Sequence, residues 1–400
     1  MYDKHCMTKA KRKLKICHLI TRMIIGGAQE NTLFSCRGQI ENGHDVTLAT
    51  GPTSGPEGKL LEEQNTPGLK VDIFPNMIRA LNPLTDFKAY LDLKKYFKEQ
   101  KFDVVHTHAS KAGIIGRAAA WAAKVPIVVH TVHGPAFHRY EKAWRNKVYI
   151  TAEKFAAKRC HKIVCVADAM TNQFLEAGIS KPEMYQTVYS GMNLEDYLQL
   201  EGDRDIRNQY GIPADAIVIG KIARLFELKG HEYLIKAAKG LVDKNPNVHF
   251  LLIGDGLLRS EIEQEVRSLG IEKHFHFSGL ISPKVVPMHT AAMDFVCHLS
   301  LSEGLPRAVV QGLAAGQPVV AYNLDGAPEV VFNDKTGYIC PPASVKEVRD
   351  ALQKLIDSKE LRQEMGQAGR KLVSEKFNWT QMVADLEGVY SDLYEKPLSY

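Results

Sequence analysis

Short apolar runs alternate with amphipathic segments along most of this 400-residue chain. In the first half, each apolar run is followed by a segment with the periodicity of a helix. Strands separated by helices of about 10 to 20 residues indicate βαβ units and a parallel sheet. The first half is predicted to contain strands at 14–20, 45–50, 70–74, 103–108, 126–131 and 162–166, and helices that end near 42 or span 83–100, 111–123 and 139–160.

The alternation is interrupted between residues 189 and 213, where turn-forming residues precede a charged stretch, so a linker is predicted there. The simplest architecture is two doubly wound α/β domains in tandem, residues 1–195 and 210–378, facing each other across a cleft where the polar strand ends gather. The second domain is predicted to contain strands at 216–223, 248–253, 275–277, 295–298 and 318–322, and helices beginning near 230, 257 and 305.

The composition, 45% hydrophobic and 24% charged, is that of an ordinary soluble globular protein. No apolar run is long enough to predict a transmembrane helix. A basic stretch at 9–15 precedes the apolar run at 16–20, an arrangement also found in signal peptides. His18 and Arg22 interrupt the apolar character, which favours a first core strand behind a short basic tail.

The seven cysteines are scattered and form no Cys-x-x-Cys pair, which favours reduced thiols and a cytoplasmic location. The fifteen histidines include no helical His-x-x-x-His pair, so no zinc site is predicted. Charge is uneven, because residues 1–200 carry 28 Lys and Arg against 19 Asp and Glu, whereas the remainder carries 23 against 27. A basic first half suggests an anionic partner, such as a membrane surface or a nucleic acid.

Glycines and histidines mark the strand ends of the first domain. Gly26 and Gly27 lie in a strand-to-helix turn, which either brings backbone N–H groups to a ligand or is only a tight turn. The turn lacks the Gly-x-Gly-x-x-Gly spacing of dinucleotide oxidoreductases. His133, followed by Gly134, is the histidine that we favour for function. A histidine at a strand end either binds a sugar hydroxyl or a phosphate, or has a structural role. The histidines at such positions are His106, His108, His130 and His133.

Cationic side chains follow the first strand of the second domain. Arg224 and Lys229 lie in one loop before a helix, where an Arg and a Lys together suit a diphosphate, although a surface pair is also common. Gly254 lies in a later strand-to-helix turn of a phosphate-binding or packing kind. Leu280 follows another strand end, where the backbone of an open loop can read a base.

The stretch 303–320 contains the most informative pattern of the chain. Glu303 stands at the mouth of a predicted helix at 305–315, and Gln311 follows two turns later. A helix N-terminus suits a phosphate, and polar side chains suit sugar hydroxyls. This pattern predicts a sugar-nucleotide site.

A basic amphipathic helix is predicted within residues 138–162, where eight Lys and Arg accompany two Glu. Trp144, Val148, Tyr149 and Phe155 interleave with the basic residues. Such a helix either lies on an anionic membrane surface or is a solvated face packed on its own domain.

These motifs together resemble glycosyltransferase family 4, whose members have the GT-B fold, retain the anomeric configuration and need no metal. The resemblance extends from about residue 16 to residue 379. It is carried by residues 26–30, 223–230 and 303–320. Residues 105–113 and 129–134 are similar to members that build lipopolysaccharide and exopolysaccharide.

The resemblance implies roles for the candidate residues of the second domain. Arg224 and Lys229 would hold the donor diphosphate, Glu303 would contact the donor sugar, and backbone N–H groups near Gly304 and Leu305 would bind a phosphate. Gln311 stands where the family has a second Glu that holds the ribose hydroxyls. An amide carries no charge, so weaker or altered nucleotide binding is expected.

The resemblance also implies roles for the first domain and the acceptor. Gly26 and Gly27 would close over the donor, and His133 would lie near the reacting sugar. The sugar nucleotide would be a co-substrate, with no cofactor and no metal. The first domain would bind a glycan or lipid-linked acceptor at the inner face of the membrane, and residues 379–400 would cross back to it.

Two other functions remain open from the sequence. A sugar-nucleotide epimerase of the same fold would convert the donor without an acceptor. A non-catalytic sugar-nucleotide-binding subunit would bind the donor without turnover, which would accord with the missing second Glu. A nucleic-acid binder is disfavoured because no recognition motif accompanies the basic charge.

Overall fold

The computed structural model describes residues 12–53, 58–200 and 204–395. Most of the basic tail expected before the first strand therefore lies outside the described residues. The first strand itself is buried in the middle of a sheet, which confirms the prediction of a core strand. Among the described helices, none combines the length and the apolar character needed to cross a bilayer.

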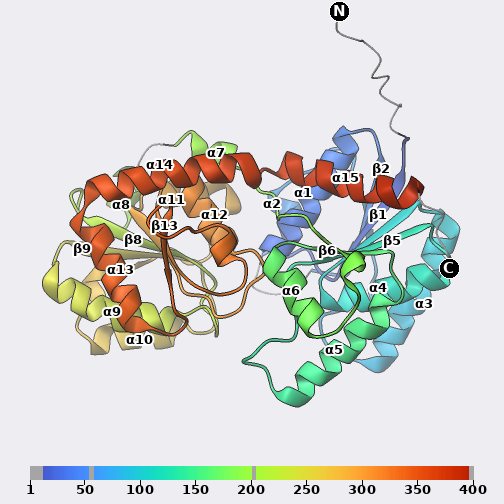
Figure 1. The fold of residues 1–400 in the computed structure, drawn as a ribbon, viewed down its shortest axis with the longest axis horizontal. Helices are drawn as coiled ribbons and strands as arrows, with labels where there is room; N and C mark the ends of the chain where they lie inside the picture. Colours follow the sequence, from blue (N-terminus) through green and yellow to red (C-terminus); the bar gives the residue numbers. More distant parts are fainter. Residues whose placement is uncertain (1–11, 54–57, 201–203, 396–400) are drawn as a thin grey trace, which may run out of the picture. The chain divides into compact units, whose positions relative to one another are not determined.

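Seven strands form the first sheet, in the order β3-β2-β1-β4-β5-β6-β7 (Figure 1). The pairs from β3 to β5 are all parallel. The order reverses between β1 and β4, and open α/β sheets bind ligands beside such a switch point. The strands are β1 Lys15–Ile20, β2 Asp45–Thr50, β3 Lys70–Ile73, β4 Val104–His108, β5 Ile127–Val132, β6 Lys162–Cys165 and β7 Tyr185–Thr187.

Helices connect these strands and cover the sheet. Helix α4 contacts both β1 and β4. A Cβ on its Gly116 would lie 2.4 Å from a Leu19 methyl carbon, so the missing side chain lets the helix approach the sheet. The helices of this region are α1 Gly27–Glu41, α2 Leu60–Glu63, α3 Pro83–Gln100, α4 Ser110–Ala122, α5 Ala143–Ala157 and α6 Asp168–Glu176.

A buried polar network joins the first sheet to the last helix, α15 Trp379–Glu395. The His18 ring lies 2.8 Å from His108 through Nδ1 and 2.8 Å from the Gln39 amide oxygen through Nε2. The His106 Nδ1 lies 2.5 Å from the Tyr390 hydroxyl. Burial lowers the pKa of His18 to about 4 despite the Gln39 contact, so its imidazole is neutral at ordinary pH.

Six parallel strands form the second sheet, in the order β10-β9-β8-β11-β12-β13 (Figure 1). The strands are β8 Ile217–Ile222, β9 Val248–Ile253, β10 Phe275–Phe277, β11 Phe295–His298, β12 Val319–Tyr322 and β13 Gly337–Cys340. With seven and six strands, the two sheets confirm the α/β fold class and the predicted pair of doubly wound sheets.

Helices cover the second sheet in two groups. Helices α9 and α13 pack together over one core, whereas α12 packs against α14 and contacts β11 and β12. The helices of this region are α7 Glu195–Leu198, α8 Arg204–Gln209, α9 His231–Lys244, α10 Arg259–Ser268, α11 Val286–Ala291, α12 Arg307–Ala314, α13 Val345–Asp357 and α14 Lys359–Lys376.

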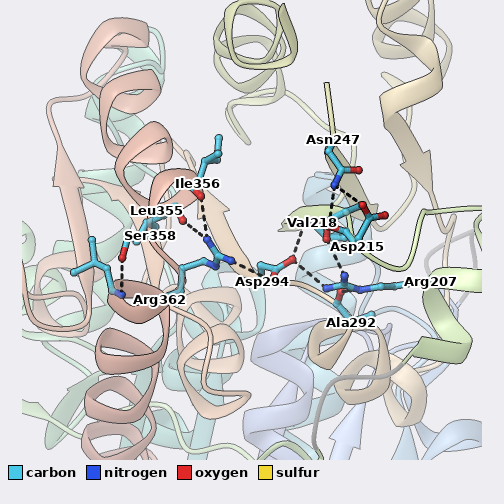
Figure 2. Close-up of polar contacts among 12 residues, drawn as sticks. Arg207, Asp215, Val218, Asn247, Ala292, Asp294, Leu355, Ile356, Ser358 and Arg362 are labelled. Atoms are coloured by element: carbon cyan, nitrogen blue, oxygen red, sulfur yellow. Dashed lines mark hydrogen bonds and ion pairs between the residues drawn. The ribbon is translucent and has the colours of Figure 1, made fainter. Parts of the chain in front are cut away.

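Asp294 connects the amino ends of β8 and β11 to helices α8 and α14 through hydrogen bonds and an ion pair (Figure 2). Its Oδ2 accepts hydrogen bonds from the Val218 N–H at 2.7 Å and from the Arg207 guanidinium at 3.0 Å. The Arg362 guanidinium lies 3.9 Å from Oδ1 and donates to the Leu355 carbonyl at 2.6 Å. These bonds fix the end of the sheet opposite to the strand ends that carry the candidate residues.

The chain folds into two compact units, and their bounds differ from those of the predicted domains. One unit holds the described residues up to 131, together with 151–164 and those from 383 onwards; the other holds 132–150 and 165–382. The predicted linker contains two short helices, α7 and α8. Several further elements were not predicted from the sequence, namely β7, β13, α2, α6, α11, α13 and α14.

Candidate functional site

The loops after β8 and β11 meet at the carboxyl end of the second sheet. Lys229 Nζ donates to Glu303 Oε1 at 2.5 Å. The Leu228 carbonyl accepts from the Leu301 N–H at 2.7 Å. A Cβ on Gly230 would lie 2.0 Å from the Leu299 carbonyl oxygen, and its φ of 68° is left-handed, so glycine is required there. The structure thus brings together two predicted site residues.

Charge keeps Glu303 ionised. Burial raises the pKa of Glu303, but Lys229 and His298 outweigh that effect and bring it below its ordinary value. The His298 Nε2 lies 4.0 Å from Glu303 Oε1. Burial lowers the pKa of His298 to about 4, although Glu303 opposes the shift. At neutral pH the site therefore holds the Glu303 carboxylate and a neutral His298 imidazole beside Lys229.

Gly304 lies against the backbone that follows β5. A Cβ at this position would lie 2.1 Å from the His133 carbonyl oxygen. The Glu303 N–H donates to the Asp325 carboxylate at 2.6 Å, and the Gly304 carbonyl accepts from the Gly326 N–H at 3.1 Å. Backbone packing and hydrogen bonds therefore fix the position of the Glu303 loop.

His133 stands beside the start of α12. Burial lowers its pKa to about 3, and the Arg307 charge adds to the shift. Its imidazole is thus neutral and can exchange hydrogen bonds with a hydroxyl. The Arg307 guanidinium donates to the Gly191 carbonyl at 3.2 Å.

Helix α12 is shorter at its start than predicted, because Pro306 occupies the N-cap with extended backbone. Leu305 is buried before it, and Gln311 is half-buried in its middle. The structure places Glu303, Leu305 and Gln311 along one loop and helix, as the sequence pattern requires.

Arg224 lies in the same loop as Lys229 but is exposed. Its guanidinium stands 5.1 Å from the centre of the Phe226 ring. Gly254 has a φ of 128°, and a Cβ there would lie 2.2 Å from the Ala223 carbonyl oxygen, so this glycine lets two strand ends approach. Leu280 is 49% exposed beyond β10. The three positions border the carboxyl edge of the second sheet.

Gly26 and Gly27 belong to the other unit. Gly26 is the N-cap of α1 in extended backbone, and its carbonyl accepts from the Glu30 N–H at 3.0 Å. No side chain caps this helix, so its first N–H groups depend on other partners. The turn follows β1, one of the two strands at the switch point of the first sheet.

Among the described residues, one group of side chains could hold a metal ion, and it consists of three histidines. Ligand atoms of His18, His106 and His108 lie within 4.8 Å of one another, and all three rings are buried. The His106 Nε2 also lies 2.6 Å from the Thr131 hydroxyl. Since hydrogen bonds already engage all three rings, the cluster serves as a polar network, and a metal ion would have to replace those bonds.

Three residues around the pair of Lys229 and Glu303 were not predicted from the sequence. The Asp325 carboxylate accepts a hydrogen bond from the Glu303 N–H, and the His298 ring lies near the Glu303 carboxylate. Lys221 lies buried in β8. A lysine inside the run Ile-Val-Ile-Gly-Lys-Ile was a visible signal, because charged residues are rarely buried in a core strand.

Two family models match the chain, "Glycosyltransferase Family 4" over residues 25–196 and "Glycosyl transferases group 1" over residues 202–372. The UDP-Gal:alpha-D-GlcNAc-diphosphoundecaprenol alpha-1,3-galactosyltransferase of Escherichia coli is 27% identical over 391 residues, covering 97% of this chain and 99% of the relative. The capsular polysaccharide biosynthesis glycosyltransferase CapM of Staphylococcus aureus is 25% identical, covering 94% and 97%.

Solved structures share the fold. The crystal structure of HepE from Anabaena in complex with UDP-glucose matches with a TM-score of 0.80 at 23% identity, covering 95% of this chain and 100% of that chain. WaaG, a glycosyltransferase involved in lipopolysaccharide biosynthesis, matches with a TM-score of 0.74 at 16% identity, covering 95% of this chain and 100% of that chain.

Proposed function

The chain belongs to glycosyltransferase family 4 and has the GT-B fold, and we propose that it moves a hexose or related sugar from a sugar nucleotide to a polysaccharide or lipid-linked glycan. The observation that carries this proposal is the contact of Lys229 with Glu303 at 2.5 Å, at the carboxyl edge of the second sheet. A cation for the diphosphate and a carboxylate for sugar hydroxyls then stand side by side.

In the proposed reaction, the bond between the anomeric carbon and the diphosphate oxygen breaks as the acceptor oxygen attacks from the same face. Attack from that face retains the anomeric configuration. Because the leaving diphosphate takes the acceptor proton, no protein base is needed. Lys229, with Arg224 in the same loop, stabilises the charge that develops on the diphosphate. Neutral His133 exchanges a hydrogen bond with the sugar. These cations allow transfer without a metal.

Thermal unfolding with a panel of sugar nucleotides tests the proposed function. A donor that binds the native state raises Tm, and UDP-sugars are the first candidates because the E. coli relative's name specifies UDP-Gal. The best donor is then incubated with membrane extract in the presence of EDTA, and the anomeric configuration of the product is read by NMR. Stabilisation by none of the nucleotides would contradict the proposal.

The same assay separates the alternatives and tests Gln311. Conversion of the donor without an acceptor would indicate an epimerase, and binding without any turnover would indicate a non-catalytic subunit. Gln311→Glu is expected to tighten nucleotide binding, because a carboxylate accepts both ribose hydroxyls more strongly than an amide. Equal affinity would remove Gln311 from the ribose site.

We further propose that the protein meets a lipid-linked acceptor at an anionic membrane surface through helix α5. Trp144, Val148 and Phe155 are 63%, 56% and 48% exposed. At about 100° per residue, the three lie on one side of the helix. Basic side chains flank this side of the helix, including Arg145 and Lys154. The combination is typical of a helix lying in a membrane interface.

Flotation with lipid vesicles tests this surface. The variant Trp144→Glu with Val148→Glu is expected to lose binding to vesicles that contain phosphatidylglycerol, since it places two carboxylates against anionic headgroups. Leu257→Glu is the matched control, because Leu257 is an 83% exposed leucine elsewhere in the chain. Unchanged flotation of the double variant, or equal loss in the control, would contradict the proposal.

A further inference from the structure

Lys221 is a buried lysine beneath the candidate donor site. It is 1% exposed and lies in β8, one residue from the strand's end. Successive side chains of a strand point to opposite faces, so Lys221 shares a face with Ile219. That face belongs to the core that also contains Cys297 and Tyr322. The sequence thus places an amino group in a largely hydrophobic core.

Several buried polar atoms around Lys221 lack hydrogen-bond partners. Among the described residues, no partner is present for Lys221 Nζ, His231 Nδ1, His298 Nε2 or the Tyr322 hydroxyl. The Lys221 charge acts on both histidines. Leaving a buried polar group unpaired costs about 1–3 kcal/mol, and more for a charged group. A cluster of such atoms behind a candidate site indicates a function that outweighs its cost in stability.

Among the described residues, no carboxylate forms a direct hydrogen bond with Lys221. Glu232 at the start of α9 and Glu303 act on it favourably, whereas Lys229 acts unfavourably. Glu303 already binds Lys229. Glu303 is therefore shared between the Lys221 and Lys229 ammonium groups, and Glu232 acts on Lys221 without a hydrogen bond.

We propose that Lys221 is a positioning residue for the donor diphosphate: its buried ammonium, which has no hydrogen-bond partner among the described residues, places positive charge beneath the site that a bound diphosphate compensates. This inference rests on the proposed function, because it assumes that Lys229 meets a diphosphate. Lys221 acts through the electric field and through Glu303, without touching the donor. In a buried environment this field is screened less than at the surface.

The titration of Lys221 accords with this role. Burial lowers its pKa to about 8, and Lys229 adds to the shift, whereas the Cys297, Glu232 and Glu303 groups oppose it. Because the folded pKa lies below the unfolded value, the cost to stability is fully present below pH 8 and disappears as the pH rises towards the unfolded pKa. A bound diphosphate raises the pKa again, so binding takes up a proton near pH 8.

The decisive variant is Lys221→Met, which replaces the ammonium with an apolar chain of similar length. Removing a buried unpaired charge is expected to raise the Tm of the ligand-free protein, more at pH 7 than at pH 9.5. The same variant is expected to bind UDP about tenfold more weakly. Lys236→Met, on the exposed face of α9, removes the same charge and should change neither quantity.

Titration calorimetry of UDP binding at pH 8, in two buffers of different ionisation enthalpy, counts the protons taken up. Wild-type protein is expected to take up a fraction of a proton, and Lys221→Met none. Equal UDP affinity in wild type and Lys221→Met, or a lower Tm of the variant, would overturn the role of Lys221 and leave the proposed function unaffected. If wild-type protein binds no nucleoside diphosphate, the proposed function fails and this inference with it.

Discussion

Lys229→Ala is expected to lower kcat for sugar transfer by about 100- to 1000-fold, with a smaller change in KM. The Lys229 ammonium, 2.5 Å from Glu303, is the cation of the proposed site closest to the sugar-binding carboxylate. Its interaction with the diphosphate strengthens as charge develops on the leaving group, so its loss affects the transition state more than the bound donor. The measurement is steady-state transfer with the donor found in the thermal panel.

Lys236→Ala is the control for this variant, because Lys236 is an exposed lysine on the following helix, α9. Its kcat should match that of the wild type. A Lys229→Ala protein with wild-type kcat would remove Lys229 from the reaction. A rise in KM at constant kcat would limit its role to holding the donor.

Gly304→Ala is expected to lower the transfer rate at least about 100-fold, which is the typical consequence of displacing a catalytic group by an ångström. A Cβ at Gly304 would lie 2.1 Å from the His133 carbonyl oxygen, so one of two backbone segments must move. The Glu303 carboxylate is attached to one of them. Transfer kinetics and thermal unfolding together separate a displaced loop from an unfolded protein.

Gly134→Ala provides a matched control on the opposite side of the same contact. A Cβ at Gly134 would lie 3.7 Å from the Gly304 nitrogen, which is ordinary van der Waals contact, and its φ does not lie in the left-handed region. This variant should retain activity. Equal activity of Gly304→Ala and wild type would show that the close approach is not needed for catalysis.

Continuous apolar runs bounded by polar residues made the strands predictable from sequence. The strands at 275–277 and 295–298 were predicted with the bounds that β10 and β11 have. Three-residue β7, with the sequence Tyr-Gln-Thr, carries no such signal. The order of the strands in each sheet could not be predicted from the sequence. For example, β8 pairs both with β9, the next strand in the chain, and with β11, which comes two strands later.

The candidate site was predictable as residue types and not as contacts. Lys229 and Glu303 were expected in one site, but their ion pair joins residues 74 positions apart and depends on β8 lying beside β11. Arg224 was expected to act with Lys229, and no sequence pattern indicated that its guanidinium lies over Phe226. Gly254 was expected to serve either phosphate binding or packing, and no sequence pattern indicated its close approach to Ala223.

The hydrogen bond between His106 and Tyr390 has a consequence for synthesis of the chain. The two residues are 284 positions apart, so the ribosome adds Tyr390 when nearly all of the protein has already emerged. Until then, His106 lacks this partner, and α15 cannot cover the first sheet. The unit that is made first is therefore completed last, and a truncation before residue 383 affects the folding of the opposite end of the sequence.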